Sequence, residues 1–178
     1  MGTRVIGLGQ RLAGDDAVGL EILDRLRAEG VPRDVELLEA TDAASLVSML
    51  ETPHRVLIVD AVLGAGMPGE IVELDEADLP AARVRLLSTH GLDVGGAIAL
   101  ARTLFGAHAA PSIRILGVPI AEVTRGSPEL SPAVGAVIAR VASVVRDHAT
   151  RPGFARGSAG LEPATPVKPP RAPRAGSA

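Results

Sequence analysis

The residues best suited to chemistry in this sequence are two acids and one histidine in three separate segments. Residues 7–16, Gly-Leu-Gly-Gln-Arg-Leu-Ala-Gly-Asp-Asp, place Asp16 beside the expected start of a helix. The apolar run Leu-Ile-Val-Asp ends at Asp60, and Ser-Thr-His-Gly places His90 in a loop of small residues. Two carboxylates and an imidazole, with positions left for water or substrate, suit a divalent transition metal. We predict a site made of Asp16, Asp60 and His90.

Each of these residues also has an ordinary structural explanation. Acids at a helix start are favoured by the helix dipole, and we expect Asp15 to be the N-cap of the first helix. Asp60 can serve a turn after its strand, and a loop histidine such as His90 is more often hydrogen-bonded than a ligand. The prediction therefore depends on the three segments meeting.

Three common catalytic or nucleotide-binding motifs are absent from the sequence. A dinucleotide fingerprint that begins at Gly7 and Gly9 would need its third glycine at position 12, which is Leu12. No Gly-Lys-Ser/Thr follows Gly14, as a phosphate-binding P-loop requires, and no Gly-x-Ser-x-Gly supplies an activated serine. These absences disfavour nucleotide-binding and serine-hydrolase functions.

Composition limits the classes of partner and metal site. The chain of 178 residues has no cysteine, so any metal must bind to nitrogen and oxygen ligands. With a net charge of −3 and 1% aromatic residues, it lacks the basic groove and the stacking platforms of a nucleic-acid binder. No apolar run approaches the roughly 18 residues that a membrane span needs, so we expect no membrane insertion and a cytoplasmic location.

Hydrophobic periodicity predicts alternating strands and helices within residues 1–150. The expected strands are 4–8, 35–38, 55–59, 70–74 and 112–117, and the expected helices are 17–29, 43–50, 91–105 and 132–147. This alternation predicts an α/β fold: a three-layer α/β/α domain with a doubly wound, mostly parallel sheet of about five strands, in which 70–74 is an antiparallel or edge strand. Residues 151–178, rich in Pro, Arg and Ala, are expected to be a disordered tail.

The expected topology gives a reason for the three segments to meet. Ligands of open parallel sheets bind beyond the carboxyl ends of the strands, where the strand order reverses. If the first and third strands are neighbours, as in the common 2-1-3 order, Asp16 and Asp60 lie at the same crevice. His90 leads from the edge region into the third helix and can reach the same end of the sheet.

Three motifs, taken together, resemble those of the NiFe-hydrogenase maturation proteases. Residues 7–19, Gly-Leu-Gly-Gln-Arg-Leu-Ala-Gly-Asp-Asp-Ala-Val-Gly, are similar to the family signature Gly-x-Gly-Asn-x-Leu-x-x-Asp-Asp/Glu-Gly-x-Gly, with Gln10 in place of its Asn and Ala17 in place of the Gly after the acids. Residues 59–61, Val-Asp-Ala, resemble its strand-end aspartate, and residues 88–92, Ser-Thr-His-Gly-Leu, its Ser-x-His segment. The resemblance covers about residues 3–148.

The resemblance implies an endopeptidase that removes the C-terminal extension of a nickel-loaded hydrogenase large-subunit precursor. Asp16, Asp60 and His90 fall on the metal-contacting positions, where they would recognise nickel that the substrate delivers and would be the catalytic residues. Two alternatives stay open: a non-catalytic α/β binding module, and an unrelated metal-dependent hydrolase with a permanently bound ion.

Overall fold

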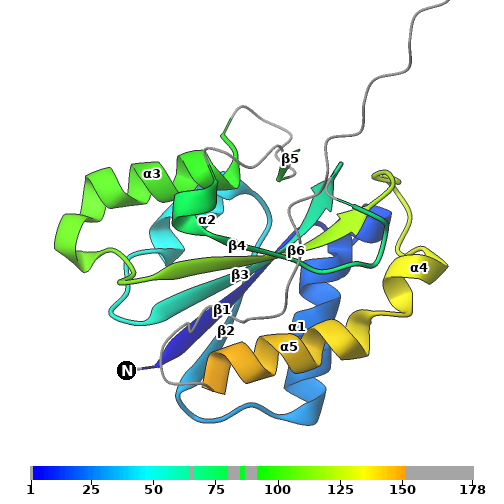
Figure 1. Ribbon diagram of the computed structural model, residues 1–178, viewed down its shortest axis with the longest axis horizontal. Helices are drawn as coiled ribbons and strands as arrows, with labels where there is room; N and C mark the ends of the chain where they lie inside the picture. The colour runs from blue at the N-terminus through cyan, green and yellow to red at the C-terminus, as the bar shows by residue number, and fades with distance from the viewer. Residues whose placement is uncertain (1, 65, 80–84, 87–91, 151–178) are drawn as a thin grey trace, which may run out of the picture.

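A twisted β-sheet with helices on both faces forms the body of the protein (Figure 1). The computed structural model describes residues 2–64, 66–79, 85–86 and 92–150. Within them the sheet has six strands: β1 (Thr3–Leu8), β2 (Val35–Ala40), β3 (Arg55–Leu63), β4 (Val72–Asp75), β5 (Arg85–Leu86) and β6 (Ile113–Ile120). Their order is β2-β1-β3-β6-β4, and β5 pairs with the end of β3.

The strand directions place the topological switch point between β1 and β3. The β1–β2, β1–β3 and β3–β6 pairs are parallel, whereas β4 lies antiparallel to β6 at the sheet edge and β5 antiparallel to β3. The chain leaves β1 toward β2 on one side and returns to β3 on the other, so the loops that follow β1 and β3 part at their carboxyl ends.

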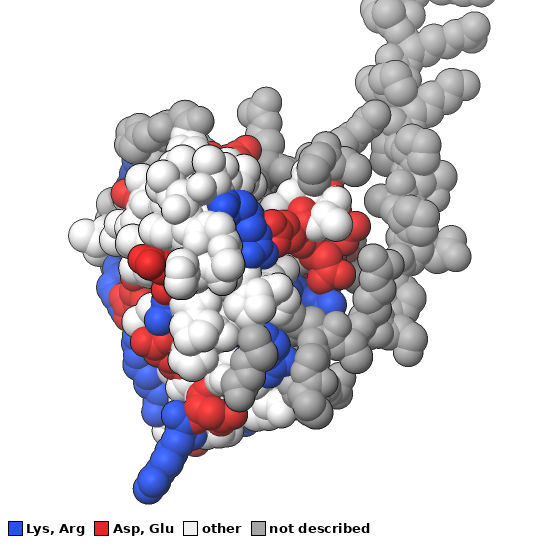
Figure 2. All heavy atoms as spheres, turned by 90° about the vertical axis from the view of Figure 1, so that its left-hand side faces the viewer, with Lys and Arg blue, Asp and Glu red and all other residues white. Residues whose placement is uncertain are grey.

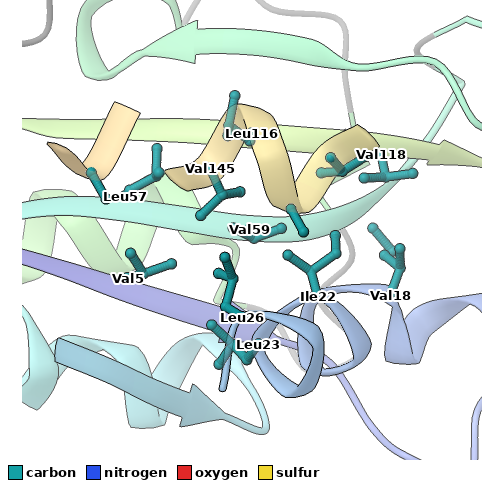
Figure 3. Close-up of a cluster of buried hydrophobic side chains, with 14 of the residues drawn as sticks. Val5, Val18, Ile22, Leu23, Leu26, Leu57, Val59, Leu116, Val118 and Val145 are labelled. Atoms are coloured by element: carbon teal, nitrogen blue, oxygen red, sulfur yellow. The ribbon is translucent and has the colours of Figure 1, made fainter. Parts of the chain in front are cut away.

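Helices of opposite faces bury two separate hydrophobic clusters. The helices α1 (Val18–Glu29) and α5 (Ile138–Thr150) pack together on one face, and α2 (Ala43–Met49) and α3 (Val94–Phe105) on the other. Figure 3 shows side chains of α1 and α5 meeting those of β1, β3 and β6 in the first cluster. Short helical turns complete the fold: η1 (Gly14–Ala17), η2 (Glu76–Asp78), η3 (Gly106–His108) and α4 (Pro132–Gly135).

Strand alternation decides which face Asp60 occupies. Leu57, Val59 and Ala61 belong to the α1/α5 cluster, and Ile58 and Val62 belong to the α2/α3 cluster. Because side chains alternate along a strand, Asp60 points to the α2/α3 face.

The end of the sheet where the parallel strands begin lies opposite their carboxyl ends, and its surface carries charges of both signs. Figure 2 shows acidic and basic side chains interspersed around a largely uncharged area on this side of the molecule. None of the helices in the part of the chain that is described combines the length and the apolar character needed to cross a membrane.

Most of the predicted elements are confirmed, including the 2-1-3 strand order and the antiparallel edge strand. Three details were wrong. The strand predicted to end at 59 continues to Leu63, because β6 pairs with it along its whole carboxyl half. The short strand β5 was not predicted, and the helix expected at 132–147 is divided into α4 and α5 after Gly135, a weak helix former. The expected tail, residues 151–178, lies outside the described residues.

A backbone contact holds α1 against the sheet. A Cβ atom at Gly7 would lie 2.5 Å from the carbonyl oxygen of Gly19, and a Cβ at Gly19 would lie 2.5 Å from the carbonyl oxygens of Leu8 and Val59. Only glycine allows helix and strands to approach this closely. The close contact therefore sets the distance between the sheet and α1, the helix that follows the Asp16 loop.

We expect Gly19→Ala to lower the free energy of unfolding by about 1–3 kcal/mol, because the methyl group overpacks against two backbone carbonyls. Urea unfolding measures this change. Gly135→Ala is the matched control, since a Cβ there meets nothing within 4 Å. Equal stability of the two variants would contradict the close contact.

Candidate functional site

Asp16 and Asp60 line one pocket at the carboxyl ends of β1 and β3. The pocket has a volume of about 110 Å³, which is enough for an ion together with several ligand atoms. Its wall is completed by the rest of the Asp16 loop and by three other parts of the chain: Leu8, Gly9, Gln10, Ala13, Thr41, Asp42, Ala43, Ala44, Leu92, Val123 and Arg125. The structure thus brings together the two predicted acids.

The loop after β1 places Asp16 through a tight reversal at Gly9. Gly9 has a φ of 141°, and a Cβ there would lie 1.9 Å from the carbonyl oxygen of Asp16. The amide of Gln10 donates a hydrogen bond of 3.0 Å to Oδ2 of Asp16. The glycine lets the loop fold over η1, and the amide orients the carboxylate toward the pocket.

Asp60 is buried in the middle of β3, so the prediction that it ends its strand was wrong. The β1 ladder reaches only Val59, which pairs with Gly7, whereas Asp60 pairs with Gly117 of β6. Asp60 is therefore the first residue of β3 beyond its ladder with β1. Its side chain is 1% exposed, and neither carboxylate oxygen has a hydrogen-bond partner among the residues described.

Burial raises the pKa of both acids. For Asp60, desolvation and then the nearby charge of Asp16 hold the pKa well above its usual range. The Ala61 amide offsets part of this rise without reaching hydrogen-bond geometry. For Asp16, desolvation raises the pKa, and the Gln10 amide and the charge of Arg125 lower it. Two close carboxylates that resist ionisation together form a site that a cation would stabilise.

Asp15 does not cap the first helix, as the sequence had led us to expect. The N-cap positions of η1 and α1 are Ala13 and Ala17, and neither end has a side-chain cap. Asp15 is 6% exposed, and its Oδ1 accepts a 2.6 Å hydrogen bond from the amide of Ser131. Because the chain turns through η1 before α1 begins, Asp15 points away from the helix start and ties the first loop to the segment before α4.

Sequence reasoning missed Arg125, which follows β6 and lines the pocket. Its one available signal was its place after the carboxyl end of a central parallel strand, in a sequence with many other arginines. Leu92 and Asp42 were also missed as pocket-lining residues, although Asp42 was correctly expected to cap α2.

His90 lies outside the described residues, so its place in the site stays a prediction. No group of three or more His, Cys, Asp or Glu suited to hold a metal occurs within the described ranges. Among the described residues the site therefore contains the two predicted acids, and Leu92, two residues beyond His90, lies in the same wall.

Fold and pocket define a doubly wound α/β protein with paired acids at its switch point. A sequence model of the hydrogenase maturation proteases matches residues 20–148. The chain therefore belongs to the hydrogenase maturation protease family, a family of endopeptidases.

Individual relatives agree with this assignment. A Methanocaldococcus jannaschii protein whose name places it with the hydrogenase maturation proteases is 29% identical over 91 residues, 49% of this chain and 59% of its own length. The hydrogenase expression/formation protein HupD of Rhodobacter capsulatus is 26% identical over 80% of this chain and 69% of its own. The structure of the [NiFe] hydrogenase maturation protease HybD from Thermococcus kodakarensis superposes with a TM-score of 0.68, at 23% identity over 84% of this chain and 99% of its own, which supports the fold.

We expect the stability of Asp60→Asn relative to the unmodified protein to grow as pH rises. The folded-state pKa of Asp60 is raised, so its contribution is complete below the unfolded pKa of about 4 and is lost as pH rises through the folded value. Urea unfolding between pH 4 and 8 measures the difference. Asp34→Asn, which removes an exposed acid just before β2, controls for the change of charge. If the difference in unfolding free energy between Asp60→Asn and the unmodified protein did not change with pH, the Asp60 carboxylate would not be destabilised by its burial.

The Asp15–Ser131 hydrogen bond gives a second stability prediction. Asp15→Ala leaves the Ser131 amide without its charged acceptor, and we expect a loss of about 1.5–3 kcal/mol in the free energy of unfolding. Asp15→Asn keeps an acceptor oxygen and should recover part of the loss. Both values come from urea titrations, and an alanine variant as stable as the parent would show that the bond contributes nothing.

Proposed function

We propose that this chain is an endopeptidase that removes the C-terminal extension of a nickel-loaded NiFe-hydrogenase large-subunit precursor. Asp16, Asp60 and His90 recognise the nickel, which the precursor carries and which is part of the substrate. The reaction takes place in the cytoplasm. Membership of the maturation protease family supports the reaction class.

The observation that carries this proposal is the carboxylate of Asp60, which is buried and has no hydrogen-bond partner among the residues described. A buried ionised acid without hydrogen bonds is costly, and the neighbouring Asp16 adds repulsion. A divalent cation presented at the pocket would stabilise both carboxylates at once and would displace the proton that burial favours on Asp60. A nickel-free precursor offers no such gain, so the charge balance of the pocket explains how a protease could distinguish the loaded form.

His90 is the third proposed ligand on sequence grounds. It stands two residues before Leu92, which lines the pocket, and two residues of chain span at most about 7 Å. A neutral imidazole also suits nickel better than a third acid would, since it adds no further negative charge.

Processing of two precursors tests the proposal. The chain is incubated with the nickel-loaded and the nickel-free large-subunit precursor of the same organism, and the mass of each product is measured. We expect a single shortened product from the loaded precursor alone. Cleavage of both precursors would remove nickel recognition from the function, and cleavage of neither would remove the proteolytic function.

Variants of the three residues test their roles in the same assay. We expect His90→Ala and Asp16→Asn to reduce processing at least about 100-fold, because each removes a group that binds the reacting complex. The matched control is His108→Ala, which removes an exposed histidine from η3 and should process the precursor normally. Normal processing by His90→Ala would exclude His90 from the mechanism.

Metal analysis of the freshly purified protein separates substrate-delivered nickel from a resident ion. We expect less than one equivalent of any transition metal, because the described ligands are two acids, one of them favoured in its protonated form. A tightly held stoichiometric metal would instead support a hydrolase with its own permanent ion.

A further inference from the structure

The loop between β6 and α4, residues 121–131, is fastened to the loop that carries Asp16. The amide of Gly126 donates to the carbonyl of Leu12 at 2.7 Å, and the amide of Gly14 donates to the carbonyl of Ser127 at 2.9 Å. Asp15 adds the partly buried hydrogen bond that it accepts from the Ser131 amide. These contacts, all made by residues that follow Arg125 closely, hold this part of the loop beside the Asp16 loop at the pocket.

Arg125 brings a positive charge, which lowers the pKa of Asp16, to a pocket whose other described ionisable residues are acids. It is exposed, and among the described pocket residues it is the one arginine or lysine. No hydrogen bond or ion pair joins its guanidinium to another described residue, and Oδ2 of Asp16 already accepts from Gln10. Its N–H donors are thus available to a ligand within the described part of the site.

Resting on the proposed function, we propose that Arg125 is a catalytic residue that donates hydrogen bonds to the carbonyl oxygen of the scissile peptide as that oxygen becomes negative. A guanidinium presents several donors in a fixed plane and keeps its charge throughout the reaction. In the proposed complex Asp16 and Asp60 balance the two charges of the substrate's nickel, so Arg125 is the remaining positive charge among the described pocket residues that can face a developing oxyanion.

The reaction step balances without a further reagent. The oxygen of a water molecule bonds to the carbonyl carbon, and the π electron pair of the C=O bond moves to the carbonyl oxygen, where Arg125 stabilises it. When this pair returns, the C–N bond breaks. The two water protons finish on the amine nitrogen, which leaves as an ammonium group, and the new chain end is a carboxylate.

Steady-state cleavage of the nickel-loaded precursor by four proteins tests this role. They are the unmodified chain, Arg125→Gln, Arg125→Lys and the control Arg140→Gln, which removes an exposed arginine from α5 on the other face of the sheet. We expect Arg125→Gln to lower kcat about 100- to 1000-fold with little change in KM, as for loss of an oxyanion donor. Arg125→Lys, which keeps the charge but not the planar fork, should recover part of this loss, and Arg140→Gln should match the unmodified chain.

Any other result for the unmodified chain or for Arg125→Gln would overturn either the role of Arg125 or the proposed function. A normal kcat for Arg125→Gln, or an effect on KM alone, would overturn the role of Arg125 while the proposed function stands. A loss that disappears when the assay pH is raised would show that Arg125 acts only through the ionisation of Asp16, and would also overturn it. If the unmodified chain cleaves neither precursor, the proposed function fails and this inference fails with it.

Discussion

The burial of Asp60 without a hydrogen-bond partner among the described residues is the constraint on which the rest of the site depends. A central strand is an unfavourable place for an acid, and the protein tolerates it at the first position of β3 beyond the ladder with β1. There the ladder on one side has ended while pairing with β6 continues. The backbone of Asp60 is therefore held firmly although its side chain faces an open pocket.

The glycines of the first motif make this arrangement possible in two ways. Gly7 and Gly19 bring α1 into backbone contact with the sheet, which sets the height of the helix that follows Asp16. Gly9 lets the intervening loop turn back, so that the Cα of Gly9 lies against the backbone of Asp16. The motif thus has a steric meaning, because each of these positions is closed to a side chain, and it places the second acid beside the first.

Much of the fold was predictable because it follows from local periodicity and a common topology. The strand order and the convergence of Asp16 with Asp60 followed from the β-α-β alternation of apolar segments. The details that failed depend on tertiary partners. The length of β3 is set by its pairing with β6, and nothing local distinguishes Asp15 from Asp16 although one binds Ser131 and the other faces the pocket. Arg125 was missed for a similar reason, since its place after β6 is a weak signal and the closure of two distant loops brings it to the acids.

The hydrogen bond between Asp15 and Ser131 joins positions separated by 116 residues. Contacts of such long sequence separation slow folding, because the loop-closure entropy has to be paid before they stabilise the chain. The segment that binds Asp15 also follows the two residues, Val123 and Arg125, that complete the pocket wall. A nascent chain that ends before these two residues therefore has both acids but cannot have the whole pocket.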